Sequence, residues 1–127
     1  MGLMLTLICG LPNAGKTTYS QRYANVIHLD DYPHPRPAHC NATVRVAKGD
    51  VVVDGIYNTR YRRRKLLEAY QGRDKKVCIW LATPVRECIR RENRSRPQQV
   101  VLNQQERFEE PSLSEGWDEI IVVDGTR

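Results

Sequence analysis

Residues 10 to 17 read Gly-Leu-Pro-Asn-Ala-Gly-Lys-Thr, a complete phosphate-binding pattern of the form G-x-x-x-x-G-K-[ST]. The glycines let consecutive backbone N–H groups point at phosphate oxygens. Lys16 can reach the β- and γ-phosphates, and the Thr17 hydroxyl can join a Mg²⁺ shell. The pattern therefore predicts a site for Mg²⁺ and for ATP or another nucleoside triphosphate, formed by Gly10, Leu11, Pro12, Asn13, Ala14, Gly15, Lys16, Thr17 and Thr18.

Carboxylates follow two later apolar runs of the chain. Asp30 and Asp31 come after Val26–Leu29, and Asp54 ends the run Asp50–Asp54. Beside a triphosphate, a carboxylate can accept the proton of an attacking hydroxyl or hold Mg²⁺ through water. We expect at least one of Asp30 and Asp31 to have such a role, although a helix cap or a turn is the alternative. Asp54 is a candidate for a water-mediated Mg²⁺ ligand or an acceptor contact.

The chain is basic, with a net charge of +5 from 20 basic and 15 acidic side chains. Arginine outnumbers lysine by fifteen to five, and arginine is suited to gripping two phosphate oxygens at once. One basic cluster is Arg60–Lys65, and a second comprises Arg86, Arg90, Arg91, Arg94 and Arg96. Two solvated helix faces would explain both clusters. Beside a triphosphate site, they favour a polyanionic second substrate.

Strand-like apolar runs alternate with helical segments along the chain. Strands are expected at Leu3–Cys9, Val26–Leu29, Asp50–Asp54, Val77–Ala82 and Glu119–Asp124. Helices are expected at Lys16–Ala24, at Thr59–Tyr70, from a Thr83 cap with Pro84 in its first turn up to Pro97, and over Pro97–Glu110. This alternation predicts an α/β fold with a five-stranded parallel sheet flanked by helices. Ligands of such sheets lie at the carboxyl ends of the strands, where Lys16, Asp30 and Asp54 would meet.

Length and composition limit the remaining possibilities. With 127 residues, the chain is expected to form a single domain spanning residues 1–127. No apolar run approaches a membrane span, and the N-terminus lacks the features of a signal peptide. The four cysteines show no C-x-x-C spacing, which is typical of a reducing compartment. A cytoplasmic protein with no membrane partner is therefore expected, and its oligomeric state is left open.

Several segments together resemble the 5′-hydroxyl polynucleotide kinases, the P-loop end-healing enzymes of bacteriophages and the kinase domains of eukaryotic polynucleotide kinase–phosphatases. The loop matches except for Asn13, where a third glycine is common. The other matching segments are Ile27–Tyr32, Val51–Asn58, the arginine-rich Arg90–Arg96, and the tail Arg107–Trp117, which reads RFEEPSLSEGW. The resemblance covers nearly the whole chain and is weakest between Tyr32 and Gly49.

The resemblance implies an adenylate-kinase-like P-loop fold with an arginine-bearing lid. It implies that Lys16, the lid residues Arg91, Arg94 and Arg96, and Asp30 as general base are the catalytic residues. It also implies acceptor contacts from Asp54, Asn58 and Arg60. Arg36 is the only candidate for the family's acceptor-phosphate arginine. It lies in Tyr32–Pro37, where three prolines favour an extended arm.

The first functional hypothesis is therefore an ATP-dependent kinase that phosphorylates the 5′-hydroxyl of DNA or RNA in end repair. One alternative is a P-loop kinase of a small hydroxyl acceptor such as a sugar, nucleoside or nucleotide-sugar. The Arg60–Lys65 cluster argues against that alternative, because a small neutral substrate does not require it. A non-catalytic nucleotide-binding module is the third hypothesis.

Overall fold

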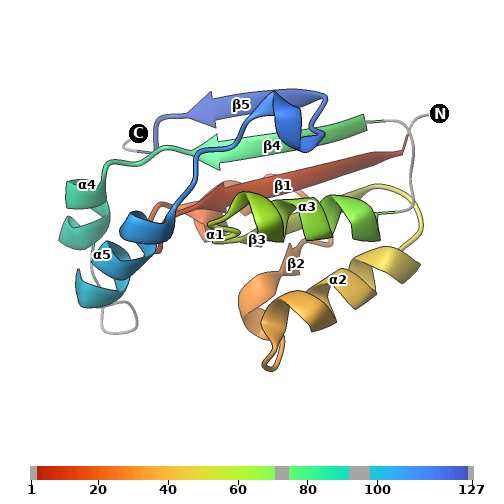
Figure 1. Cartoon of the computed structure of the whole chain (residues 1–127), viewed down its shortest axis with the longest axis horizontal. Helices are drawn as coiled ribbons and strands as arrows, with labels where there is room; N and C mark the ends of the chain where they lie inside the picture. Colours follow the sequence, from red (N-terminus) through yellow and green to blue (C-terminus); the bar gives the residue numbers. More distant parts are fainter. Residues whose placement is uncertain (1–2, 71–74, 92–97, 126–127) are drawn as a thin grey trace.

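A computed structural model describes residues 3–70, 75–91 and 98–125. Within these ranges, five parallel strands form one sheet in the order β2-β3-β1-β4-β5 (Figure 1). The strands are β1 (Met4–Gly10), β2 (Ile27–His28), β3 (Val51–Gly55), β4 (Lys75–Leu81) and β5 (Glu119–Val123). Strand β1 lies in the centre and is almost entirely buried, as expected for a continuous apolar run between two neighbours. The predicted fold class is confirmed.

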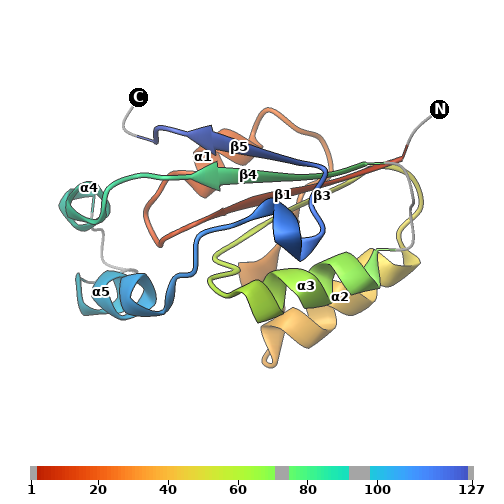
Figure 2. The ribbon, with the colours of Figure 1, turned by 45° about the horizontal axis from the view of Figure 1, so that its top comes forward.

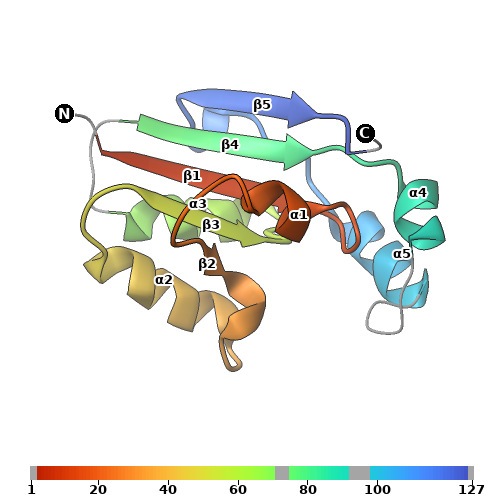
Figure 3. The same cartoon turned by 180° about the vertical axis from the view of Figure 1, so that it is seen from behind.

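Helices cover both faces of this sheet. The helices are α1 (Lys16–Ser20), α2 (Arg36–Val46), α3 (Arg60–Ala69), α4 (Val85–Arg90) and α5 (Gln98–Arg107), with short 3₁₀ turns η1 (Leu29–Asp31) and η2 (Leu113–Glu115). Figure 2 shows α3 beside α2, and the view from behind in Figure 3 shows α1 on the opposite face. Helices α4 and α5 lie beyond the carboxyl ends of the strands (Figure 1). None of the helices in the described ranges is long and apolar enough to cross a membrane.

The core consists of two clusters, one on each side of the sheet. On the side of α3, Leu5 and Leu7 of β1 pack in one cluster with Leu66. On the side of α1, Ile8 packs in a second cluster with Ile79 of β4. Each of these side chains is at most 3% exposed. The carboxyl edge of the sheet is therefore anchored to tightly packed strands.

Helix α1 is shorter than the predicted Lys16–Ala24. Its last turn tightens, because the amides of Gln21 and Arg22 bond carbonyls only three residues back. Asn25 then adopts a left-handed backbone with a φ of 57°, and the chain turns toward β2. The helical pattern alone did not reveal this early end.

Helix α2 was not predicted, because the prolines of Tyr32–Pro37 were expected to exclude a helix. Pro35 lies at the N-cap and Pro37 falls within the first turn, where no backbone N–H is needed. Only Cys40 and Val44 of α2 are buried, so the apolar pattern is sparse. The extended arm is thus confined to the residues before Pro35.

The predicted Thr83 cap is also wrong. Pro84 occupies the N-cap position of α4 without a side-chain cap. The Thr83 hydroxyl instead donates a hydrogen bond of 2.8 Å to the carbonyl of Ala14 in the phosphate-binding loop. By contrast, Thr59 caps α3 by accepting from the Arg62 amide at 3.2 Å.

Candidate active site

The loop between β1 and α1 has the backbone expected of a phosphate cradle. Asn13 and Gly15 adopt positive φ angles of 66° and 103°. The Ala14 amide donates to the Leu11 carbonyl at 3.1 Å. The Asn13 side-chain amide donates to the Cys88 carbonyl of α4 at 3.2 Å. Asn13, which stands where polynucleotide kinases commonly have a third glycine, therefore links the loop to α4.

Lys16 points back into this loop. Its Nζ donates to the carbonyls of Gly10 at 2.9 Å and Leu11 at 2.7 Å. Burial lowers the pKa of Lys16 to about 8, while nearby negative groups that include Asp54 and Asp30 act in the opposite direction. The ammonium is thus held by carbonyls that phosphate oxygens could replace.

A cavity of about 960 Å³ opens above the loop. Lys16 and Thr17 line it, and so do Asp30 of η1 and Ile56. Arg91 and Gly125 are also among the lining residues. The cavity therefore brings Lys16 and the carboxylate of Asp30 to one space, as the strand-end rule predicts, whereas Asp54 is not among its lining residues.

Asp54, at the end of β3, is 6% exposed and pairs with a histidine. Its Oδ2 lies 2.8 Å from Nδ1 of His28, which is its register partner on β2. This contact fixes the orientation of the carboxylate at the sheet edge. The sequence analysis missed His28, because its role depends on the β2–β3 register, which no single segment reveals.

Arg91 is engaged by main-chain oxygens. Nη1 donates to the carbonyls of Asn13 at 3.4 Å and Ala14 at 3.3 Å, and Nη2 donates to the carbonyl of Gly125. Nε donates to Glu87 at 3.3 Å. The guanidinium therefore joins α4, the loop and the turn after β5. The other predicted lid residues, Arg94 and Arg96, lie outside the described residues.

Gly125 is needed where that turn meets the loop. A Cβ at this position would lie 1.7 Å from Thr83 Oγ1 and 2.8 Å from the Ala14 carbonyl. Nothing in the local sequence had marked Gly125 as a cavity residue. Its role follows from the close approach of β5 to the loop.

Two of the predicted acceptor residues face other parts of the protein. Asn58 is 4% exposed, and its Nδ2 donates to Gln104 of α5 at 2.8 Å. Arg60 is exposed at the start of α3, and its amide donates to the Glu109 carboxylate at 2.8 Å. Neither side chain is among those that line the cavity. Arg36, a third candidate, begins α2.

The basic cluster Arg60–Lys65 is not one exposed surface. The Arg63 side chain is buried, and its Nε and Nη2 donate to both carboxylate oxygens of Glu115 at 2.7 and 3.1 Å. It also donates to the carbonyls of Tyr57 and Glu109 at 2.8 and 2.6 Å. The Trp117 indole donates to the same carboxylate at 3.2 Å. Part of the RFEEPSLSEGW tail therefore packs as a structural clamp on α3.

Comparisons with known proteins identify the fold. No protein-family model and no curated protein matches the sequence significantly. A gluconokinase from Sinorhizobium meliloti 1021 matches with a TM-score of 0.75 and 19% identity, over 99% of this chain and 83% of that chain. A sugar kinase from Janibacter sp. HTCC2649 matches with a TM-score of 0.74 and 14% identity, over 100% and 87%. A protein from Chloroflexus aurantiacus described as a kinase matches with a TM-score of 0.69 and 16% identity, over 98% of this chain and 86% of that chain.

The chain thus has the fold of P-loop kinases. The resemblance to polynucleotide kinases holds at that level, and the predicted nucleic-acid partner is wrong. Two of these structural neighbours are named as a gluconokinase and a sugar kinase, and neither name refers to a nucleic acid. The Arg60–Lys65 cluster, which favoured a polyanion, contains a buried structural arginine.

Proposed function

We propose that the protein is a kinase that transfers the γ-phosphoryl group of ATP to a hydroxyl of a small acceptor. The observation that carries this proposal is the lining of one cavity by Lys16 and Asp30. Lysine neutralises charge on the β- and γ-phosphates, and a carboxylate accepts the proton of the attacking hydroxyl. The names of the structural neighbours support a small acceptor.

The reaction is a direct transfer in this scheme. The acceptor oxygen bonds to the γ-phosphorus as its proton passes to Asp30, and the bond to the β–γ bridging oxygen breaks to release ADP. The loop amides and Lys16 hold the phosphates in place. Their positions are set by the loop backbone and by its link to Thr83.

The residues present fit Mg²⁺, which prefers oxygen ligands and commonly binds together with substrate phosphates. The exposed Thr17 lies in the first turn of α1 and lines the cavity, and Asp54 is oriented by His28 at the adjacent strand end. Thr17 would bind the ion directly, and Asp54 or Asp30 would bind it through water. When bound, Mg²⁺ supplies charge neutralisation on the phosphates.

Acceptor-dependent release of ADP tests this proposal. Purified protein, ATP and Mg²⁺ would be incubated with sugars, alditols, sugar acids, sugar phosphates and nucleosides, and products identified by ³¹P NMR. We expect a phosphorylated small acceptor and stoichiometric ADP, both lost in Lys16→Ala. Tight nucleotide binding without acceptor-dependent ADP release across the panel would instead favour a non-catalytic nucleotide-binding module.

A further inference from the structure

The residues that line the cavity come from both halves of the sheet. Lys16 and its loop follow the central strand β1, while Leu81 and Val123 end β4 and β5. Of the described residues that follow β2 and β3, Asp30 and Ile56 line the cavity. Because Asp30 is the proposed base, an acceptor hydroxyl that reacts there lies in the β2–β3 half of the cavity, next to Ile56.

The segments that carry these two residues pack directly against each other. Gly55 precedes Ile56, and Leu29 precedes Asp30. A Cβ at Gly55 would lie 2.7 Å from the Cβ of Leu29. Because carbon atoms in contact lie about 3.5–4.0 Å apart, only glycine permits so close an approach. The contact between η1 and the end of β3 therefore sets Asp30 and Ile56 side by side at the cavity.

The residue after Ile56 has a strained backbone. Tyr57 has a φ of 38°, in the left-handed region that bulky side chains rarely adopt. Its side chain is 1% exposed, and its hydroxyl lies 3.3 Å from Sγ of Cys40 in α2. Its carbonyl accepts a hydrogen bond of 2.8 Å from Nη1 of the buried Arg63. These contacts hold Tyr57 in an unfavourable conformation, and such strain is typical of segments that position a functional site.

Ile56 brings an apolar surface to this half of the cavity. Its side chain is half-buried and lines the cavity, and a β-branched side chain has few rotamers, so it forms a stiff wall. The resemblance to polynucleotide kinases implied polar acceptor contacts after the same strand, at Asp54 and Asn58. Neither of these lines the cavity, and Asn58 donates to Gln104 instead. The contact that the structure offers beside Asp30 is therefore apolar.

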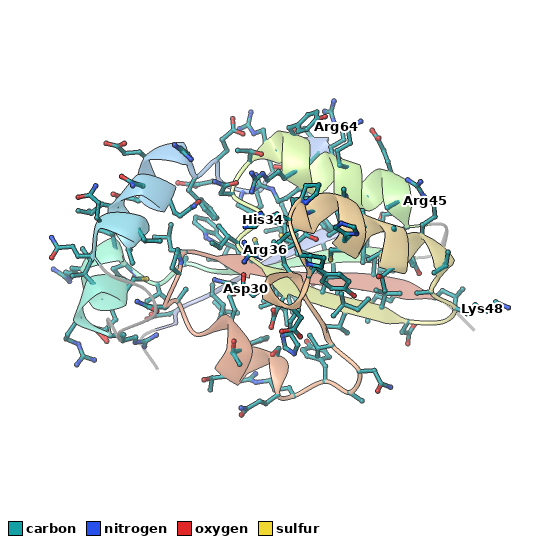
Figure 4. The ribbon with its side chains drawn as sticks, turned by 90° about the horizontal axis from the view of Figure 1, so that it is seen from below. Asp30, His34, Arg36, Arg45, Lys48 and Arg64 are labelled. Carbon is teal, nitrogen blue, oxygen red and sulfur yellow. The ribbon has the colours of Figure 1, made fainter. Side chains whose placement is uncertain are left out.

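The exposed basic residues of α2 and α3 lie elsewhere on the molecule. In Figure 4, Asp30 lies near the centre of the view, whereas Arg45, Lys48 and Arg64 lie toward its periphery. All three of these basic side chains are exposed. They therefore belong to a different part of the surface from the wall that Ile56 forms.

We infer that Ile56 determines acceptor specificity by packing against the carbon skeleton of the acceptor, which presents a C–H face beside the hydroxyl that reacts at Asp30. Sugars and polyols have such faces. The close contact at Gly55 and the strained backbone of Tyr57 hold Ile56 in this place. The inference rests on the proposed function for the role of Asp30, but the contact with Ile56 can be measured without turnover.

Two substitutions of equal shape test the contact, since threonine has a hydroxyl where valine has a methyl group. D-glucose, D-glucitol and D-gluconate would be titrated by calorimetry into protein saturated with a non-hydrolysable ATP analogue. For the probe that binds most tightly, Ile56→Val should weaken binding by about fourfold, the loss expected for one buried methylene. Ile56→Thr should weaken it by about a further fivefold or more, because its hydroxyl faces a C–H surface without a hydrogen-bond partner. Affinity for the ATP analogue should be unchanged in both variants.

Ile27 of β2 offers a matched control. It is also half-buried, and it is not among the residues that line the cavity. Ile27→Thr should leave every affinity unchanged. The inference is overturned if no probe binds, if Ile56→Thr binds the probe as tightly as Ile56→Val, or if Ile27→Thr weakens binding as much as Ile56→Thr.

Gly55→Ala tests how Ile56 and Asp30 are positioned. The added Cβ must displace Leu29 and with it η1, so probe binding should weaken and kcat for phosphoryl transfer should fall by about tenfold or more. Affinity for the ATP analogue should stay within about twofold of the wild type, because the loop amides and Lys16 hold the phosphates. A purely structural role would lower stability and leave kcat and probe affinity of the folded protein unchanged, which would contradict the positioning role of Gly55.

The same proteins also separate this inference from the proposed function. Probe binding that depends on Ile56, without ADP release in the presence of ATP and Mg²⁺, would support the contact and contradict the kinase. Phosphoryl transfer to a probe with the same KM in the wild type, Ile56→Val and Ile56→Thr would support the kinase and contradict the contact.

Discussion

Two arginine environments of this molecule differ in how completely the guanidinium group is satisfied. Arg63 donates to both oxygens of Glu115 and to two carbonyls, and it is fully buried. Arg36 donates to His34, and its buried Nε has no partner within the described ranges. The comparison teaches that a buried guanidinium with several carboxylate and carbonyl partners holds distant segments together, whereas one with an unpaired buried Nε should contribute less to stability.

Breaking the Arg63 clamp should have the largest effect on stability. Arg63→Met leaves Glu115 buried without its cation, so the free energy of unfolding should fall by about 3–5 kcal/mol. Denaturation by urea would measure the change. Arg64→Met, which alters the exposed neighbour, should stay within about 0.5 kcal/mol of the wild type. Equal, small effects from both variants would contradict the structural role of Arg63.

The same clamp should depend on pH. Although burial acts in the opposite direction, hydrogen bonds from Arg63 and from the Ser112 amide hold the pKa of Glu115 below its usual value. Its stabilising contribution is therefore present above the unfolded pKa of about 4.3 and is lost as pH falls through the lower folded pKa. Glu115→Gln should flatten this part of the stability curve in acid titrations followed by circular dichroism. An unchanged curve would show that other carboxylates dominate.

Replacing Arg36 should have a much smaller effect on stability. Because Arg36→Met removes a buried donor that lacks a partner, the free energy of unfolding should change by less than about 1 kcal/mol. Urea denaturation beside Arg63→Met would give both values under the same conditions. A loss as large as that of Arg63→Met would remove the contrast between the two arginines.

Lys16 extends the comparison, since its ammonium donates to two main-chain carbonyls, those of Gly10 and Leu11. Its pKa of about 8 predicts that nucleotide binding at pH 8.5 takes up roughly half a proton or more, because phosphates stabilise the charged form. Calorimetry in two buffers of different ionisation enthalpy would measure this uptake. It should be near zero at pH 6.5, and equal uptake at both pH values would contradict the lowered pKa.

The part of the site proposed to bind the nucleotide could be predicted because its residues are consecutive in the sequence. One contiguous motif after a buried strand defines Gly10–Thr18, and strand ends place Asp30 and Asp54 at the same edge. The rest depends on contacts between distant segments. His28 requires the β2–β3 register, Gly125 requires the approach of β5 to the loop, and the burial of Arg63 requires the tail to fold back on α3.

The central claim is that Asp30 acts as the base for phosphoryl transfer in the cavity that it lines together with the β1–α1 loop. The most direct measurement compares Asp30→Asn with Asp31→Asn, a matched change at a neighbour that is not among the residues lining the cavity, in nucleotide affinity and in transfer to the most active acceptor. Asp30→Asn should bind ATP like the wild type and lose about 10²- to 10⁴-fold in transfer, while Asp31→Asn retains it. Undiminished transfer by Asp30→Asn would contradict the account.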